Sequence, residues 1–484
     1  MALDITLELL DCNGLTELDF TFIEQDDFFD RIFHHKQYFK GNEFAFSLYN
    51  GKWITIDGES FPAYDKGRWW SKKFGERWIV FENPVSKKDF YNAVTENATS
   101  NSYSQFESIG ARFINGGKKI CLAGGSFCDT NLKQINNKIV VEKSISLNEN
   151  ISEMQQDTIL KFRREVEFIK EYDLKFFPRI LSFGEIGGRF HAISEFFHGY
   201  TLAEKIFHKS ITNIESIDLL TEILTTLKST IYNKGRSPGR WTSQEDRIID
   251  RIIRRFDALI LSSDEITLQW KSLLLKDYVT INEKKYMGWP KLLKWIKAKQ
   301  ATHFLEFSNE ICHGDLIFDA ILVSAHREWK LIDPNGDAIS KYYDLGKLSL
   351  SLLSSYELLK YDCFHLEYSD VDYSGIPKFH FSIKHSSSKA MFSIALQLPY
   401  IIFNSGFCEQ EELSGNNLLL LNGLHNASLP WFHLIHHRNQ NRSIAFFLFA
   451  IIRLNQFIHA SESGKRISLT EAVTVCLTEG GIYH

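Results

Sequence analysis

The sequence has 484 residues, which is too long for one ordinary hydrophobic core, so we expect two or three folding units. Hydrophobic residues make up 44% and charged residues 24%, with 9 Pro, a balance that excludes a disordered or Pro-rich linker protein. The formal net charge of -5 provides no positive field to gather polyanions, which disfavours a dedicated nucleic-acid binder.

Cysteine usage and hydropathy favour a cytoplasmic protein without a membrane span. The seven cysteines are scattered and contain no C-x-x-C pair, which is typical of free thiols in a reducing compartment. The first residues carry Asp4, Glu8 and Asp11 where a signal peptide would need a basic start. The strongest apolar run, at 444–452, is shorter than the ~20 residues that cross a bilayer, so we expect a buried helix there.

Residues 1–105 predict a small, aromatic-rich α+β domain to which the sequence assigns no function. Asn50-Gly51 separates two strand-like runs, which is a hairpin signal. A cluster of tryptophans follows, at Trp69, Trp70 and Trp78. Burial of these rings is favoured over stacking on a sugar, although this domain could also dock a protein partner. The polar stretch 94–104 predicts a linker.

Residues 106–200 predict a small antiparallel sheet with one packed helix. The helix is expected at 153–172, because apolar residues recur there at three- and four-residue steps. These residues are Ile159, Phe162, Val166 and Ile169. Two further strands after it are joined by a Gly-containing turn at 184–188.

Residues 201–484 read as mostly helical, interrupted at 311–344 by two short apolar strands. One helix carries a row of arginines, for which a solvated face is favoured over a wall for an anionic substrate. They are Arg247, Arg251, Arg254 and Arg255. Three histidines at 433, 436 and 437 have no carboxylate or Cys at ligand spacing, so core or surface positions are favoured over a metal site.

The interruption holds two aspartates, Asp315 and Asp333, eighteen residues apart and each at the edge of a short strand. Such an arrangement would place both carboxylates at one end of a hairpin. Phosphoryl transfer needs one carboxylate to orient the attacking hydroxyl, another to hold the metal ion, and cations on the phosphates.

Three motifs in this region resemble the aminoglycoside phosphotransferase and choline kinase superfamily. They are His313-Gly314-Asp315-Leu316, Ile332-Asp333-Pro334 and Tyr342-Tyr343-Asp344-Leu345. The pattern is most similar to that of a bacterial branch often encoded with surface-polysaccharide genes. The resemblance implies an α+β, bilobal protein-kinase-like fold, with the small lobe at 106–200 and a mostly helical C-lobe at 201–484, preceded by the α+β domain at 1–105.

The same resemblance implies roles for individual residues. Asp315 would be the catalytic base, with His313 as a neighbour that steadies the loop, and Asp333 would bind Mg2+. Lys143 would contact the phosphates of ATP, with Glu165 as its helix partner. Lys143 lies on the same strand face as Val141, because alternate residues of a strand point the same way.

The remaining ATP contacts follow from the resemblance in the same way. It implies that Gly124, Gly125 and Ser126 form a turn over the phosphates. By itself this Gly pair indicates only a hairpin turn. Glu195 and Phe197 would belong to the connection beside the adenine.

Two positions depart from the family pattern. Ala320 stands where the family has its second metal ligand, an Asn, and Asn335 stands where an Arg usually follows the aspartate. Asp319, next to Ala320, is an oxygen ligand of the kind that Mg2+ prefers, so it is a candidate replacement. The resemblance implies an ATP- and Mg2+-dependent phosphotransferase that acts on a hydroxyl of a small molecule, a sugar or an amino alcohol used in surface polysaccharides. The alternative is a pseudokinase that binds nucleotide or serves as a scaffold.

Overall fold

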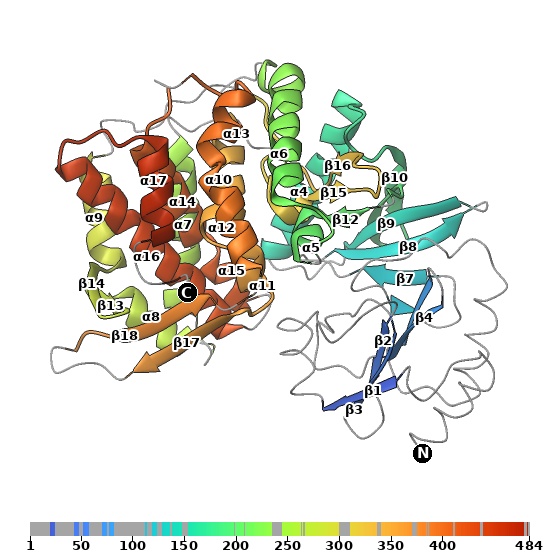
Figure 1. The fold of residues 1–484 in the computed structure, drawn as a ribbon, viewed down its shortest axis with the longest axis horizontal. Helices are drawn as coiled ribbons and strands as arrows, with labels where there is room; N and C mark the ends of the chain where they lie inside the picture. The colour runs from blue at the N-terminus through green and yellow to red at the C-terminus, as the bar shows by residue number, and fades with distance from the viewer. Residues whose placement is uncertain are drawn as a thin grey trace. The chain divides into compact units, whose positions relative to one another are not determined.

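The chain is a mixture of helices and strands that divides into two units (Figure 1). Unit 1 contains Met1–Tyr200 and Val323–Lys330, and unit 2 contains Thr201–Leu322 and Leu331–His484. The computed structural model describes residues 20–24, 43–47, 52–57, 70–74, 77–81, 112–113, 119–122, 128–135, 138–147, 153–197, 199–207, 209–234, 244–262, 264, 267–299, 310–335, 340–369, 375–383, 385, 387–409, 412–435, 439–478 and 482. The expected linker at 94–104 lies outside these residues.

Unit 1 is built on one sheet with the strand order β1-β3-β2-β4-β5-β6-β7-β8-β9-β11-β10. In chain order the strands are β1 (Phe20–Glu24), β2 (Glu43–Ser47), β3 (Lys52–Asp57), β4 (Trp70–Phe74), β5 (Arg77–Phe81), β6 (Arg112–Phe113), β7 (Lys119–Leu122), β8 (Asp129–Ile135), β9 (Lys138–Ser146), β10 (Ile180–Ile186) and β11 (Arg189–Glu195). The predicted pairing of β2 with β3 is confirmed. Side chains of the tryptophan cluster lie outside the described residues.

A short apolar core joins this sheet to helix α4 (Glu153–Tyr172). The predicted apolar face of α4 is confirmed, since Ile159, Phe162 and Val166 are all buried. The Phe162 ring meets Phe190 of β11 edge to face at a centroid distance of 5.1 Å. The hairpin between β10 and β11 is also confirmed: Gly187 has φ +58°, as its two-residue turn requires.

Unit 2 is mostly helical, as the sequence predicts. Its helices are α5 (Leu202–Phe207), α6 (Asn213–Leu227), the π-turn η4 (Lys228–Tyr232), α7 (Gln244–Leu261), α8 (Leu268–Leu274), α9 (Trp289–Lys299), the 3-10 turn η7 (Phe318–Ala320), α10 (Lys341–Leu353), α11 (Tyr356–Lys360), α12 (Ser388–Leu396), α13 (Leu398–Asn404), α14 (Gly415–Ala427), α15 (Pro430–Ile435), α16 (Gln440–Glu462) and α17 (Leu469–Thr478). A capping box of Thr212 and Glu215 starts α6.

Helix α16 is the centre of this unit. Among the described residues it is the one helix long and apolar enough to cross a membrane, and 89% of its apolar window is buried inside the fold. The prediction of a buried helix at 444–452 is therefore confirmed. Gly423 lets α14 approach closely, because a Cβ there would lie 2.7 Å from Cδ2 of Leu454 in α16. A helix that is apolar on all sides belongs in a core of this kind.

Unit 2 also contains a four-stranded sheet that the sequence did not predict. Its order is β14-β13-β18-β17, with bounds β13 (Tyr278–Ile281), β14 (Lys284–Met287), β17 (Phe364–Ser369) and β18 (Lys378–Ile383). The parallel pair β13 and β18 joins segments about a hundred residues apart, as in Ile281 opposite Phe379. A separate sheet has the order β12-β15-β16, with bounds β12 (Tyr200–Thr201), β15 (Ile321–Val323) and β16 (Trp329–Leu331). The last two are the strands predicted within 311–344.

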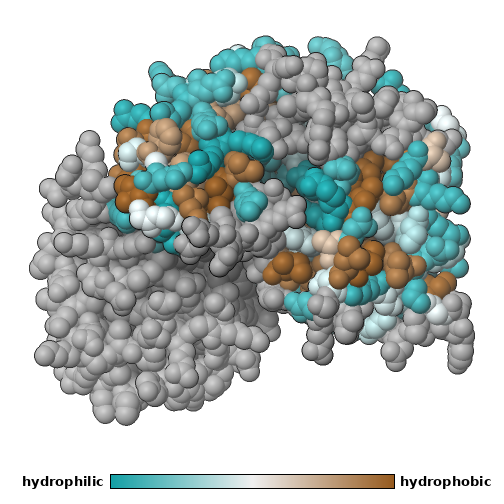
Figure 2. Space-filling model, turned by 180° about the vertical axis from the view of Figure 1, so that it is seen from behind, coloured by the Kyte–Doolittle hydropathy of each residue, from teal (hydrophilic) through white to brown (hydrophobic). Residues whose placement is uncertain are grey.

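Hydrophobic side chains also gather on the surface, where brown patches lie among teal ones (Figure 2). In unit 1 the edge strand β10 exposes Leu181, Phe183 and Ile186, and α4 exposes Leu160. Lys170 lies over the Phe183 ring, with its Nζ 4.2 Å from the ring centroid.

We expect Phe162→Ala to lower the free energy of unfolding of unit 1 by about 3–5 kcal/mol, because it removes a buried ring and leaves a cavity. The matched control on the same helix is Leu160→Ala, where the side chain is 48% exposed and the change should stay within about 0.5 kcal/mol. Urea denaturation of both variants measures the difference. Equal effects of the two substitutions would contradict the core described above.

Candidate functional site

The loop that carries Asp315 lies at residues 311–317, before the turn η7. Ile311, Cys312 and His313 are buried, and the Ile311 N–H donates to the carbonyl of Lys234 at 3.2 Å. Gly314 has φ +80°, in the left-handed region that glycine adopts without strain. The central residue of the His-Gly-Asp motif is therefore required by the backbone conformation of the loop.

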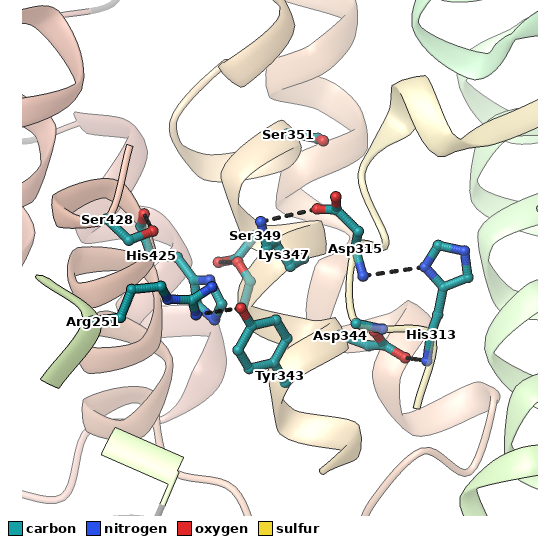
Figure 3. Close-up of polar contacts among 12 residues, drawn as sticks. Arg251, His313, Asp315, Tyr343, Asp344, Lys347, Ser349, Ser351, His425 and Ser428 are labelled. Carbon is teal, nitrogen blue, oxygen red and sulfur yellow. Dashed lines mark hydrogen bonds and ion pairs between the residues drawn. The ribbon is translucent and has the colours of Figure 1, made fainter. Parts of the chain in front are cut away.

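Asp344, in the first turn of α10, holds the backbone of this loop (Figure 3). Its carboxylate accepts hydrogen bonds from the N–H of His313 at 2.8 Å and of Gly314 at 2.5 Å. It also accepts from the hydroxyl of Tyr232 at 2.9 Å. The side chain is fully buried, and this burial raises the pKa of Asp344 to about 7, although the three hydrogen bonds oppose the shift.

Asp315 is fixed at both its backbone and its side chain. Its N–H donates to Nδ1 of the buried His313 at 3.2 Å, so the neutral imidazole carries its proton on Nε2. Its Oδ1 forms an ion pair with Nζ of Lys347 at 2.9 Å. The Asp315 side chain is 23% exposed, so solvent or a ligand can reach it. His313 thus occupies the steadying position that the resemblance implies.

The residues expected to bind Mg2+ do not come together in one cluster of ligands. Asp319 forms an ion pair with Lys360, so its carboxylate already has a cationic partner. Ala320 is buried and its carbonyl accepts from the N–H of Ile332. Asp333 is exposed, with φ +58°. Among the described residues, no group of three His, Cys, Asp or Glu side chains could hold a metal ion. Asp333 therefore remains the better candidate ligand, and the pairing of Asp319 with Lys360 disfavours Asp319.

Near η7 lie two acids that sequence reasoning missed, Glu357, which is fully buried, and Glu204, which is partly buried. Glu357 accepts hydrogen bonds from Ser351 Oγ at 2.6 Å and from the N–H of Phe318 at 3.1 Å. Burial raises the pKa of Glu357, and burial also raises that of Glu204 to about 7. Glu204 exchanges hydrogen bonds with Thr201, a T-x-x-E pattern that is visible in the sequence as a helix start.

In unit 1 the structure brings Lys143 and Glu165 together. Nζ of Lys143, on β9, lies 2.7 Å from Oε2 of Glu165, on α4. The two side chains are 17% and 9% exposed, so the pair is less screened by solvent than a surface pair. The ammonium also lies 5.2 Å from the centroid of the Phe162 ring. The strand lysine and helix glutamate thus have the arrangement that the resemblance implies.

The other nucleotide-site candidates are described only in part. Glu195 ends β11, and its carboxylate lies 3.4 Å from Nζ of Lys330. Phe197 is partly buried close to Gly199, where an added Cβ would lie 2.8 Å from the ring. Gly124, Gly125 and Ser126 lie outside the described residues, so the turn over the phosphates stays a prediction.

The arginines of α7 do not form the solvated face that was favoured. Arg251 donates to the hydroxyl of Tyr343 in α10 (Figure 3). Arg255 donates to the carbonyl of Ser428 and lies over the Trp431 ring. Arg254 does face solvent, beside Asp250. Two of these arginines therefore join α7 to its neighbours, because a long side chain can bury its stem while its guanidinium reaches a polar partner.

The expectation for the histidines is confirmed where the structure describes them. His433 is buried and stacks on Phe446, with centroids 4.6 Å apart. His436 and His437 lie outside the described residues. No family model matches the chain, and no curated protein matches it.

Replacing Asp344 should destabilise the protein strongly. Asp344→Ala would leave two backbone N–H groups and the Tyr232 hydroxyl without their acceptor in a buried place, so we expect a loss on the order of 3–5 kcal/mol in the free energy of unfolding. Urea denaturation measures it, with exposed Asp218→Ala as the control. A loss near that of the control would show that the loop does not depend on this carboxylate.

The raised pKa of Glu204 predicts a pH-dependent contribution to stability. Between its ordinary pKa of 4.5 and about 7, the folded state keeps a proton that the unfolded state releases, so this contribution is lost as the pH rises. From pH 5 to pH 8 we expect the free energy of unfolding of the wild type to fall relative to that of Glu204→Gln, on the order of 3 kcal/mol. Urea denaturation at the two pH values tests this, and a constant difference would contradict it.

Proposed function

We propose that the protein transfers the γ-phosphoryl group of ATP to a hydroxyl of a small molecule. The observation that supports this most is the fixed position of Asp315, whose backbone is held through Asp344 and whose carboxylate is partly exposed. A general base must be oriented toward the proton that it accepts. Asp315 would accept the proton of the attacking hydroxyl as the new O–P bond forms and ADP leaves.

The Lys143–Glu165 pair supports the ATP half of the proposal. Kinase-like enzymes use a strand lysine on the phosphates, oriented by a helix glutamate, and the geometry in unit 1 has this form. Glu165 would hold the ammonium in place before the nucleotide binds. The Phe162 ring lies against the same ammonium, with its centroid 5.2 Å from Nζ.

One carboxylate, Asp333, fits a magnesium ion, since Mg2+ is commonly held by one or two carboxylates together with the phosphates and water. When bound, the ion would neutralise charge on the phosphates. Ala320 supplies no oxygen, and Asp319 is engaged by Lys360, so the chain offers fewer ligands than the family pattern. The acceptor class, a sugar or amino alcohol of a surface polysaccharide, rests on the motif resemblance.

A cytoplasmic location fits a reaction that consumes ATP. The described cysteines Cys128, Cys312, Cys363, Cys408 and Cys476 are buried and reduced, as in a reducing compartment. A protein partner for residues 1–105 remains part of the proposal.

The alternative is a pseudokinase that binds nucleotide or serves as a scaffold. Two observations favour it: Ala320 in place of a ligand, and the ion pair that occupies Asp319. A phosphotransferase and a nucleotide-binding pseudokinase both predict ATP binding to Lys143, and they differ in whether Mg2+ and Asp315 matter; a scaffold predicts no ATP binding.

The test is ATP binding by thermal shift, with and without Mg2+, followed by transfer of labelled γ-phosphate to a panel of sugars and amino alcohols. We expect Mg2+-dependent binding that Asp333→Asn removes. Asp315→Asn should keep the binding and lower turnover by about 10²- to 10⁴-fold, because it removes the base. Asp218→Asn is the surface control.

The outcomes separate the two candidates. A rise in melting temperature with ATP that is the same with and without Mg2+, together with no phosphate transfer, would support the nucleotide-binding pseudokinase. The absence of any shift would sink the phosphotransferase and the nucleotide-binding pseudokinase, and would leave only the scaffold. Full turnover in Asp315→Asn would show that another group is the base.

A further inference from the structure

Helix α10 contacts the Asp315 loop at two points. Asp344 accepts from the backbone of residues 313 and 314, and Lys347 pairs with the side chain of Asp315. Residues three apart on a helix lie on the same face, so both contacts come from one turn of α10. In Figure 3 both side chains point from α10 toward the loop.

We infer that Lys347 is a positioning residue for the phosphotransfer proposed above, which holds the carboxylate of Asp315 in one orientation and keeps it ionised. The inference rests on that proposed function. Asp344 fixes the main chain of the loop, but it leaves the χ angles of Asp315 undetermined. The ion pair at 2.9 Å adds a constraint on the side chain, because it holds one carboxylate oxygen of Asp315 beside the ammonium.

The surroundings of Asp315 make a cation necessary. Asp344 on α10 and Tyr356 on α11 both lie close enough to interact electrostatically with Asp315, and the imidazole of His313 is neutral. Without Lys347, an anionic Asp315 would face a second carboxyl group. The Lys347 side chain is 14% exposed, so water screens its attraction only in part. The ammonium therefore favours the unprotonated form that can accept the proton of a hydroxyl.

The experiment measures ATP hydrolysis, with water as the acceptor, in wild type, Lys347→Met and Lys347→Arg. We expect Lys347→Met to lower kcat by about 10- to 100-fold, since a misplaced catalytic group costs rate, while KM for ATP changes less than about twofold. The acidic limb of its pH–rate profile should move to higher pH, because the carboxylate has lost its cation. Lys347→Arg should restore part of kcat.

The control is Lys341→Met on the same helix. Lys341 is equally buried, at 16% exposure, but pairs with Glu310 and Glu412, so its kcat and pH profile should match the wild type. Circular dichroism checks folding, and if Lys347→Met does not fold, the profile of Lys347→Arg decides.

Three results would overturn the inference. A folded Lys347→Met with unchanged kcat and pH profile would remove the role of Lys347 and leave the proposed function standing. An equal loss in Lys341→Met would show a general effect on α10. No hydrolysis or transfer by the wild type would overturn the proposed function, and the inference with it.

Discussion

The carboxylate of Asp344 is the interaction on which the candidate site depends. It is fully buried, and three hydrogen-bond donors, two of them backbone N–H groups, offset the cost of removing it from water. Two of these donors are the N–H groups of His313 and Gly314. The hydrogen bonds that stabilise the buried carboxylate therefore also fix the backbone conformation of Gly314. The Asp315 loop and the helical core are therefore stabilised together, because the side chain of Asp344 connects them.

In unit 1, partly buried charges are stabilised by an ion pair between two side chains. Lys143 on β9 and Glu165 on α4 form an ion pair. The contact between Phe162 and Phe190 packs α4 against β11, the strand next to β9, and so keeps the two charges close together. The two side chains are 17% and 9% exposed, whereas Asp344 is fully buried, so desolvation is a smaller penalty for this pair than for Asp344.

The sequence predicts best what depends on local pattern. The apolar face of α4, the Gly187 turn and the buried helix α16 all follow from periodicity or turn chemistry. It failed where distant segments meet: the pairing of β13 with β18 leaves no local signal, and the row of arginines on α7 reads as solvated until Tyr343 and Ser428 are placed beside it. The motif located Asp315 and Asp344, but the role of Asp344 as an acceptor became visible only in three dimensions. Lys347 lies two residues after the last of the three motifs, and the sequence assigned it no role.

Helix α10 contacts the Asp315 loop and also packs in the helical core, so folding by itself constrains the sequence of its first turn. Tyr343, Asp344 and Leu345 are fully or almost fully buried, and a Cβ at Gly346 would lie 2.3 Å from the ring of His425. Substitutions in this turn would therefore be removed by selection for folding, even in a descendant that had lost catalysis. The packing of the helical core therefore requires these four residues. Asp333 is exposed, so a substitution there would open no cavity of this kind in the core.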